Sequence, residues 1–145
     1  MKIAIIRERG SWETRVAATP ESVKKLIGLG LDVHVESGAG ARSRYSDDAY
    51  REAGATVAAE AQVLDGADVL LVVERPPREQ VARLPAGAML IGQLAPFRDR
   101  GDIEHFAECG IDAFAMELMP RISRAQSMDV LSSQSNLAEI GRAHV

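Results

Sequence analysis

The sequence predicts a single α/β domain built on an open parallel sheet that is flanked by helices. Apolar segments of strand length alternate with segments of helical spacing, and this alternation is typical of a parallel sheet. Several strand-like segments are continuous apolar runs, as expected for parallel strands covered on both faces. The 145 residues, 46% hydrophobic and 26% charged, are enough for one domain with its own core.

The clearest helix signal in the first half of the chain is its first helix start. Thr19 can cap the helix, Pro20 suits the first turn, and Glu21 is favoured at the positive end of the helix dipole. We expect this helix to end near Gly28 or Gly30. The other elements expected in this half are a strand at 2–6, a strand at 32–36, a helix at 46–54 and a brief strand at 55–57.

The second half contains the strongest strand signal, the apolar run at 67–73, which is followed by Pro76-Pro77. A proline pair cannot continue a central strand, so it marks the end of this run. The elements expected after it are a helix at 78–84, a strand at 88–92, a helix at 102–109, a strand at 111–116 and a helix at 128–137.

Composition excludes several classes of function. The net charge of −4 and the 4% of aromatic residues disfavour nucleic acid as a partner. The single cysteine, Cys109, allows no intramolecular disulfide, and we interpret it as a structural residue at a helix end without a neighbouring His or Lys. His34, His105 and His144 are too scattered to predict a metal site. No apolar run approaches the roughly 18 residues of a membrane span.

Two loops follow predicted strands and need interpretation. Gly38-Ala39-Gly40 begins like a dinucleotide-binding fingerprint, but the third glycine and the long helix behind it are missing, so we predict a structural turn. The charged loop from Arg7 to Arg15 lies at the carboxyl end of the first strand, where α/β sheets collect ligands. Glu13 and Arg15 in this loop either contact a ligand or form an ion pair.

The segment from 117 to 136 is rich in hydrogen-bonding side chains interleaved with apolar ones. On composition alone it is either a polar helix start, capped by Ser127 or Asp129, or a binding loop. Its sequence from Arg121 to Leu137 resembles the loop that holds the nicotinamide end of NAD(H) in the α subunit of proton-translocating NAD(P) transhydrogenases. The resemblance extends over residues 1–138 and includes 13–20 and 35–40.

The resemblance implies that Arg121, Gln126, Asp129 and Ser132 contact NAD(H), and it assigns a catalytic role to none of them. An aspartate can accept hydrogen bonds from both ribose hydroxyls, and an arginine can hold a carboxamide or phosphate oxygen. NADP(H) would be bound by a partner, the NADP(H)-binding domain or β subunit. Hydride transfer between two nicotinamides needs reacting carbons about 3–3.5 Å apart, which a loop that clamps one ring permits.

The resemblance also implies the wider setting of the chain. The expected fold resembles the catalytic domains of formate and glycerate dehydrogenases, and the α subunits are expected to form a homodimer. The expected location is cytoplasmic, peripheral to the inner membrane as part of a membrane complex. Residues 1–138 are the expected N-terminal subdomain of the NAD(H)-binding component, and the Rossmann half would follow it. We expect the chain alone to be inactive.

Alanine dehydrogenases are the main alternative, because they are similar in this half, including Arg15. Their amine oxidation uses a lysine and a histidine, and the aligned positions here are Val72 and Gln93, which cannot do acid–base work. Val72 and Glu74 also depart from the Lys-Val-Gln-Arg-Pro pattern usual in transhydrogenases. A third, non-enzymatic alternative is a dimerising scaffold made from a truncated gene.

The last seven residues, 139–145, have a different origin in our interpretation. Glu-Ile-Gly-Arg-Ala-His-Val is the translation of GAG-ATC-GGA-AGA-GCA-CAC-GTC, a widely used sequencing-adapter read. We therefore expect the natural sequence to differ after Ala138, and the fold prediction stops at that residue.

Overall fold

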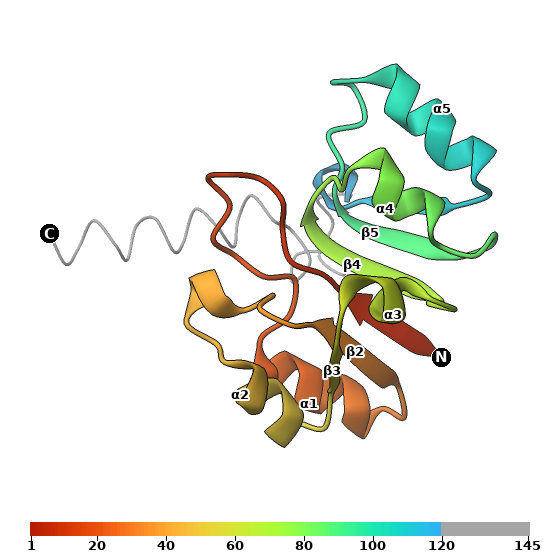
Figure 1. The fold of residues 1–145 in the computed structure, drawn as a ribbon. Helices are drawn as coiled ribbons and strands as arrows, with labels where there is room; N and C mark the ends of the chain where they lie inside the picture. Colours follow the sequence, from red (N-terminus) through yellow and green to blue (C-terminus); the bar gives the residue numbers. More distant parts are fainter. Residues whose placement is uncertain (120–145) are drawn as a thin grey trace, which may run out of the picture.

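The computed structural model describes residues 1–119, which form a six-stranded parallel sheet with helices on both faces (Figure 1). The strand order is β3-β2-β1-β4-β5-β6, and every neighbouring pair is parallel. This confirms the predicted open parallel α/β sheet. The strands are β1 (Lys2–Ile5), β2 (Asp32–Glu36), β3 (Thr56–Ala58), β4 (Val69–Glu74), β5 (Met89–Gln93) and β6 (Asp112–Ala115).

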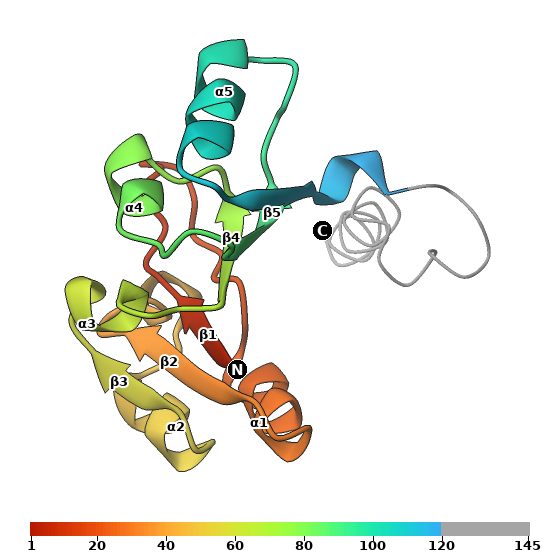
Figure 2. The same cartoon turned by 90° about the vertical axis from the view of Figure 1, so that its right-hand side faces the viewer.

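Two groups of helices cover the two faces of the sheet (Figure 2). The helices are α1 (Pro20–Gly28), α2 (Asp47–Glu52), α3 (Glu60–Leu64), α4 (Arg78–Ala82) and α5 (Arg100–Glu108), with 3₁₀ turns at Ala41–Ser43 and Met116–Leu118. Ile3 and Ile5 of β1 belong to the core cluster that contains residues of α1 and α2. Ala4 and Ile6 belong to the other cluster, with residues of α3, α4 and α5. Successive strand residues point to opposite faces, so both faces become core.

Local capping explains where the first helices begin. The Thr19 side chain accepts a hydrogen bond from the Ser22 N–H at 3.1 Å, and Pro20 occupies the first turn of α1 as predicted. Ser46 does the same for α2, accepting from the Ala49 N–H at 3.1 Å. These polar side chains replace hydrogen bonds that the first turn of a helix cannot make internally.

The Gly38–Gly40 segment is a packed turn, as predicted. Its first glycine has a φ of +83°, and its N–H donates to the Asp47 carboxylate at 2.9 Å. A Cβ on Gly40 would lie 2.7 Å from the Tyr50 ring and 2.8 Å from the Tyr45 Cβ. The glycines therefore serve the turn geometry and the close approach of two tyrosines.

The structure differs from the sequence prediction in a few places. Helix α3 was not expected, and β4 spans Val69–Glu74 rather than 67–73. The expectation that Cys109 has no neighbouring His is wrong, because α5 brings His105 one turn before it, with the Sγ and Nε2 atoms 3.6 Å apart. The predicted helix at 128–137 and the tail 139–145 lie outside the described residues. Within residues 1–119, the helices are too short or too polar to cross a bilayer.

Candidate functional site

The strand order itself marks a place for a ligand. From β1 the sheet grows outward in one direction through β2 and β3 and in the other through β4, β5 and β6. In open α/β sheets the carboxyl ends of the two strands at such a reversal leave a crevice, and ligands bind there. The crevice here lies between β1 and β4, where residues 6–19 form the loop that connects β1 to α1.

The β1–α1 loop is attached to the carboxyl end of β2. Glu36, the last residue of β2, is 7% exposed and accepts from the Arg7 N–H at 2.7 Å and from the Arg9 guanidinium at 3.0 Å. The Arg9 guanidinium also pairs with Glu60 of α3. A buried carboxylate with charge-assisted hydrogen bonds gives the start of this loop one fixed position.

The same loop is attached to β4 by Glu8. The register between β4 and β5 shifts between Leu71 and Glu74, which is typical of a β-bulge. At this irregularity the Glu8 carboxylate accepts from the N–H groups of Val73 at 2.5 Å and Glu74 at 3.3 Å. Burial raises the pKa of Glu8 above its ordinary value, and these two N–H donors oppose that effect.

Glu13 holds Arg15 in a fixed orientation. Its carboxylate accepts from the Arg15 backbone N–H, Nε and Nη2, each at 2.8 Å. These hydrogen bonds hold the pKa of Glu13 below its ordinary value although the residue is 7% exposed. The sequence left open whether these residues form an ion pair or contact a ligand. The structure has the ion pair, and the Arg15 side chain also lines a cavity.

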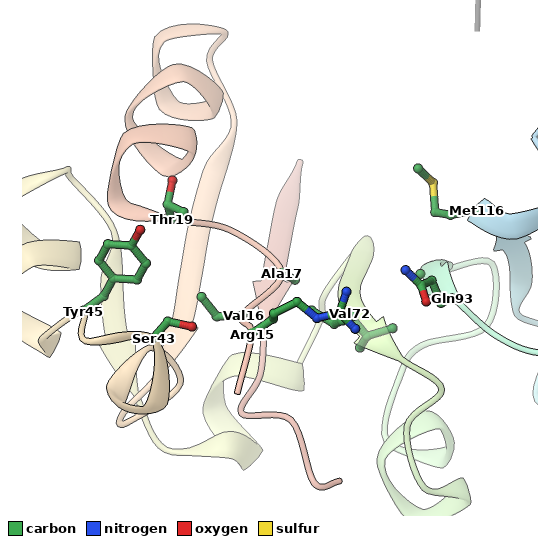
Figure 3. Close-up of a pocket in the computed structure, with 11 residues that line it drawn as sticks. Arg15, Val16, Ala17, Thr19, Ser43, Tyr45, Val72, Gln93 and Met116 are labelled. Atoms are coloured by element: carbon green, nitrogen blue, oxygen red, sulfur yellow. The ribbon is translucent and has the colours of Figure 1, made fainter. Parts of the chain in front are cut away.

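The cavity has a volume of about 510 Å³ and lies between this loop, the 3₁₀ turn after β2 and the ends of β4 and β5 (Figure 3). Figure 3 shows the Arg15 side chain extending toward Val72. Arg15 is the one charged residue of the lining, which comprises Arg15, Val16, Ala17, Thr19, Ser43, Tyr45, Val72, Val73, Gly92, Gln93 and Met116.

The three positions compared with alanine dehydrogenases in the sequence all line this cavity. Arg15 comes from the loop, Val72 from β4 and Gln93 from β5. Val72 is 6% exposed and packs so closely on Gly92 that a Cβ there would lie 2.5 Å from its Cγ2. Within the described lining, the side chains next to Arg15 are therefore apolar or carry neutral hydrogen-bonding groups.

The turn after β5 is held by Glu117, which sequence reasoning did not identify. Its carboxylate accepts from the N–H groups of Leu94 at 3.0 Å and Ala95 at 3.1 Å. Ala95 has a φ of +44°, an uncommon conformation for a residue with a side chain. Two hydrogen bonds to one carboxylate stabilise this turn directly after Gln93.

The predicted NAD(H) contacts Arg121, Gln126, Asp129 and Ser132 lie outside the described residues. The described chain ends at Met119, shortly after Met116 of the cavity lining. Sequence reasoning did not identify Ser43, Tyr45 and Met116 as part of a site. Thr19 also lines the cavity, and its sequence signal was the helix cap.

The parallel sheet with a cavity at its strand reversal defines an α/β ligand-binding domain of the doubly wound class. The chain belongs to the alanine dehydrogenase/PNT N-terminal domain family, whose profile matches residues 4–138.

Individual relatives distinguish the branches of this family. The first portion of the NAD(P) transhydrogenase subunit alpha of Rhodospirillum rubrum, a separate protein, is 53% identical over 144 residues, covering 95% of this chain and 38% of that protein. The crystal structure of transhydrogenase from Sinorhizobium meliloti matches with a TM-score of 0.91 and 48% identity, covering 95% of this chain and 41% of that one. An alanine dehydrogenase of Halomonas elongata is 42% identical over 95 residues, covering 65% of this chain and 26% of that protein.

Proposed function

We propose that this chain is the N-terminal part of the NAD(H)-binding α subunit of a proton-translocating NAD(P) transhydrogenase. The complete enzyme would pass a hydride between NADH and NADP⁺, coupled to proton translocation through a separate membrane part. The match to the Rhodospirillum rubrum subunit over 95% of the chain carries this proposal. The chain spans 38% of that relative's length, so the activity belongs to the larger protein.

The lining of the cavity supports hydride transfer over amino-acid oxidation. Oxidation of an amine needs a group that accepts a proton, and in the described lining Val72 and Gln93 occupy the positions where alanine dehydrogenases carry lysine and histidine. A bound nicotinamide supplies or accepts the hydride itself. Val72 and Met116 can exclude water from such a ring, and the Gln93 amide can pair with a carboxamide.

The proposal assigns the nucleotide contacts to the segment after β6. Arg121, Gln126, Asp129 and Ser132 would bind NAD(H), and a β subunit or NADP(H)-binding domain would bring NADP(H) to the exposed side of the ring. We further propose a homodimer of α subunits at the cytoplasmic side of the inner membrane, attached to the membrane part of the complex.

The test uses Asp129→Ala in the complete α subunit assembled with its NADP(H)-binding partner. Loss of hydrogen bonds to a charged acceptor costs about 1.5–3 kcal/mol, so we expect NADH affinity to fall about tenfold or more, together with the transhydrogenation rate. Asp65→Ala, at the end of α3, is the control. Unchanged affinity and rate in Asp129→Ala would refute the ribose contact, and robust alanine oxidation by the complete protein would refute the function.

A further inference from the structure

We propose that Glu74 is a specificity-determining residue of the cavity, where it makes the site select uncharged small molecules over carboxylates. This inference rests on the proposed function, because it takes the cavity as the place where the reacting groups meet. It concerns a residue at the end of β4 that differs from the glutamine usual in transhydrogenases.

The charge of Arg15 is already opposed within the protein. Glu13 takes the Nε and Nη2 donors of the guanidinium, each at 2.8 Å. The Glu13 side chain is 6% exposed and the Arg15 side chain is 42% exposed, so the carboxylate lies behind the guanidinium, away from solvent. One negative charge thus cancels the positive charge before any ligand arrives.

Glu74 adds a second negative charge to the same group. Its Oε2 atom lies 2.9 Å from the point where a Cβ on Gly10 would stand, and the Glu13 Cβ lies 3.4 Å from that point. The absence of a side chain at Gly10 thus leaves room for the Glu74 carboxylate next to Glu13. Consistent with this placement, the Glu74 charge helps to raise the pKa of Arg15.

No cation in the described lining offsets this excess. The lining contains no charged residue besides Arg15, because Val72 and Gln93 are neutral. Arg42 is close in sequence to the lining, but its guanidinium donates to the backbone carbonyls of Gly10 and Glu13, each at 3.1 Å. At neutral pH, Arg15 with Glu13 and Glu74 therefore carries a net negative charge.

A carboxylate that enters the cavity meets this net negative charge, and in a partly buried site such repulsion is weakly screened. An uncharged amide of the same shape escapes the repulsion and can pair with the neutral Gln93 side chain. Removing the Glu74 charge should relieve the repulsion for the carboxylate and leave the amide unaffected.

The experiment compares pyruvate with pyruvamide, which differ only in carboxylate and amide. Each is titrated into the ¹⁵N-labelled 145-residue chain, and binding is followed by the NMR signal of the Arg15 Nε–H. We expect pyruvamide to bind the wild type more tightly. Glu74→Gln should tighten pyruvate binding about tenfold and leave pyruvamide binding within about twofold. Glu108→Gln makes the same charge change at the end of α5, at the opposite edge of the sheet, and should alter neither.

The ratio of the two affinities decides the proposal. It is overturned if wild-type chain prefers pyruvate, or if Glu74→Gln leaves the ratio unchanged. The comparison within the wild type does not depend on how any variant folds. No nicotinamide nucleotide is present, so the outcome is independent of whether the complete enzyme transfers hydride.

Discussion

The pairing of Arg15 with Glu13 joins folding to the site at the scale of single residues. Three hydrogen bonds converge on one nearly buried carboxylate, whereas the guanidinium reaches the cavity. A free arginine side chain would lose conformational entropy on binding a ligand. Here that entropy is lost on folding, so the Arg15 side chain is preorganised in the cavity.

Replacing Glu13 tests how much this pair stabilises the fold. Glu13→Gln keeps the shape but removes the charge, and we expect the free energy of unfolding in urea to fall by about 1–2 kcal/mol at neutral pH. Glu21→Gln is the matched control, because Glu21 pairs with Lys25 at 3.5 Å with both side chains exposed. Its loss should be about 0.5 kcal/mol or less. Equal losses would mean that burial adds nothing to the Glu13 pair.

Two glycines offer a second test at the residue scale. Gly40→Ala would place a Cβ 2.7 Å from the rigid Tyr50 ring, so we expect a loss of about 1–3 kcal/mol. Gly28→Ala, at the last residue of α1, would meet nothing within 4 Å and should gain up to about 1 kcal/mol. Thermal unfolding of both variants measures these changes. A neutral Gly40→Ala would show that the turn yields without cost.

At the scale of elements, Glu8 connects the β1–α1 loop to β4, and its titration has a definite sign. The folded protein holds the Glu8 proton more tightly than the unfolded chain, because burial raises its pKa from 4.5. Glu8 is protonated in both states below that value. As the pH rises through the window up to the folded pKa, the folded state keeps more protons, so Glu8 makes stability fall.

The prediction for Glu8→Gln follows from this sign. The variant cannot ionise, so its stability relative to wild type should rise between about pH 4 and about pH 7. Urea unfolding of both proteins at the two pH values measures the difference. Glu52→Gln, on the exposed part of α2, should show no such trend. A relative stability of Glu8→Gln that falls with pH would place the Glu8 pKa below its ordinary value.

Elements with local signals could be predicted from the sequence, and those without could not. Helix α1 was predicted because Thr19 and Pro20 specify its start. Helix α3 was not, because its cap, Ala59, makes no side-chain hydrogen bond and the burial of Val63 and Leu64 holds the helix on the sheet. Tertiary contacts of this kind leave little trace in a short segment.

The candidate site divides in the same way. The sequence marked Arg15, Val72 and Gln93 individually through the resemblance, but only the strand order brings them to one cavity. Glu8 reaches backbone N–H groups 65 and 66 residues away, and Glu117 reaches one 23 residues away. No residue pattern announces a side chain that binds distant backbone.

At the scale of the whole molecule, the chain corresponds to 38% of the length of its Rhodospirillum rubrum relative. A dinucleotide site normally buries most of its ligand. The resemblance assigns the dinucleotide-binding Rossmann half to the part of the family that follows this segment. The cavity of about 510 Å³ at the sheet edge is then one wall of a larger site.

We therefore expect the 145-residue chain to bind NADH with a dissociation constant above about 1 mM and to transfer no hydride. Titration followed by NADH fluorescence measures the affinity, and the NMR spectrum of the same sample verifies that the chain is folded. The complete α subunit, titrated in parallel, should bind far more tightly. Sub-millimolar binding by the 145-residue chain would mean that these residues already contain a nearly complete nucleotide site, and the division of labour between the two halves would have to be redrawn.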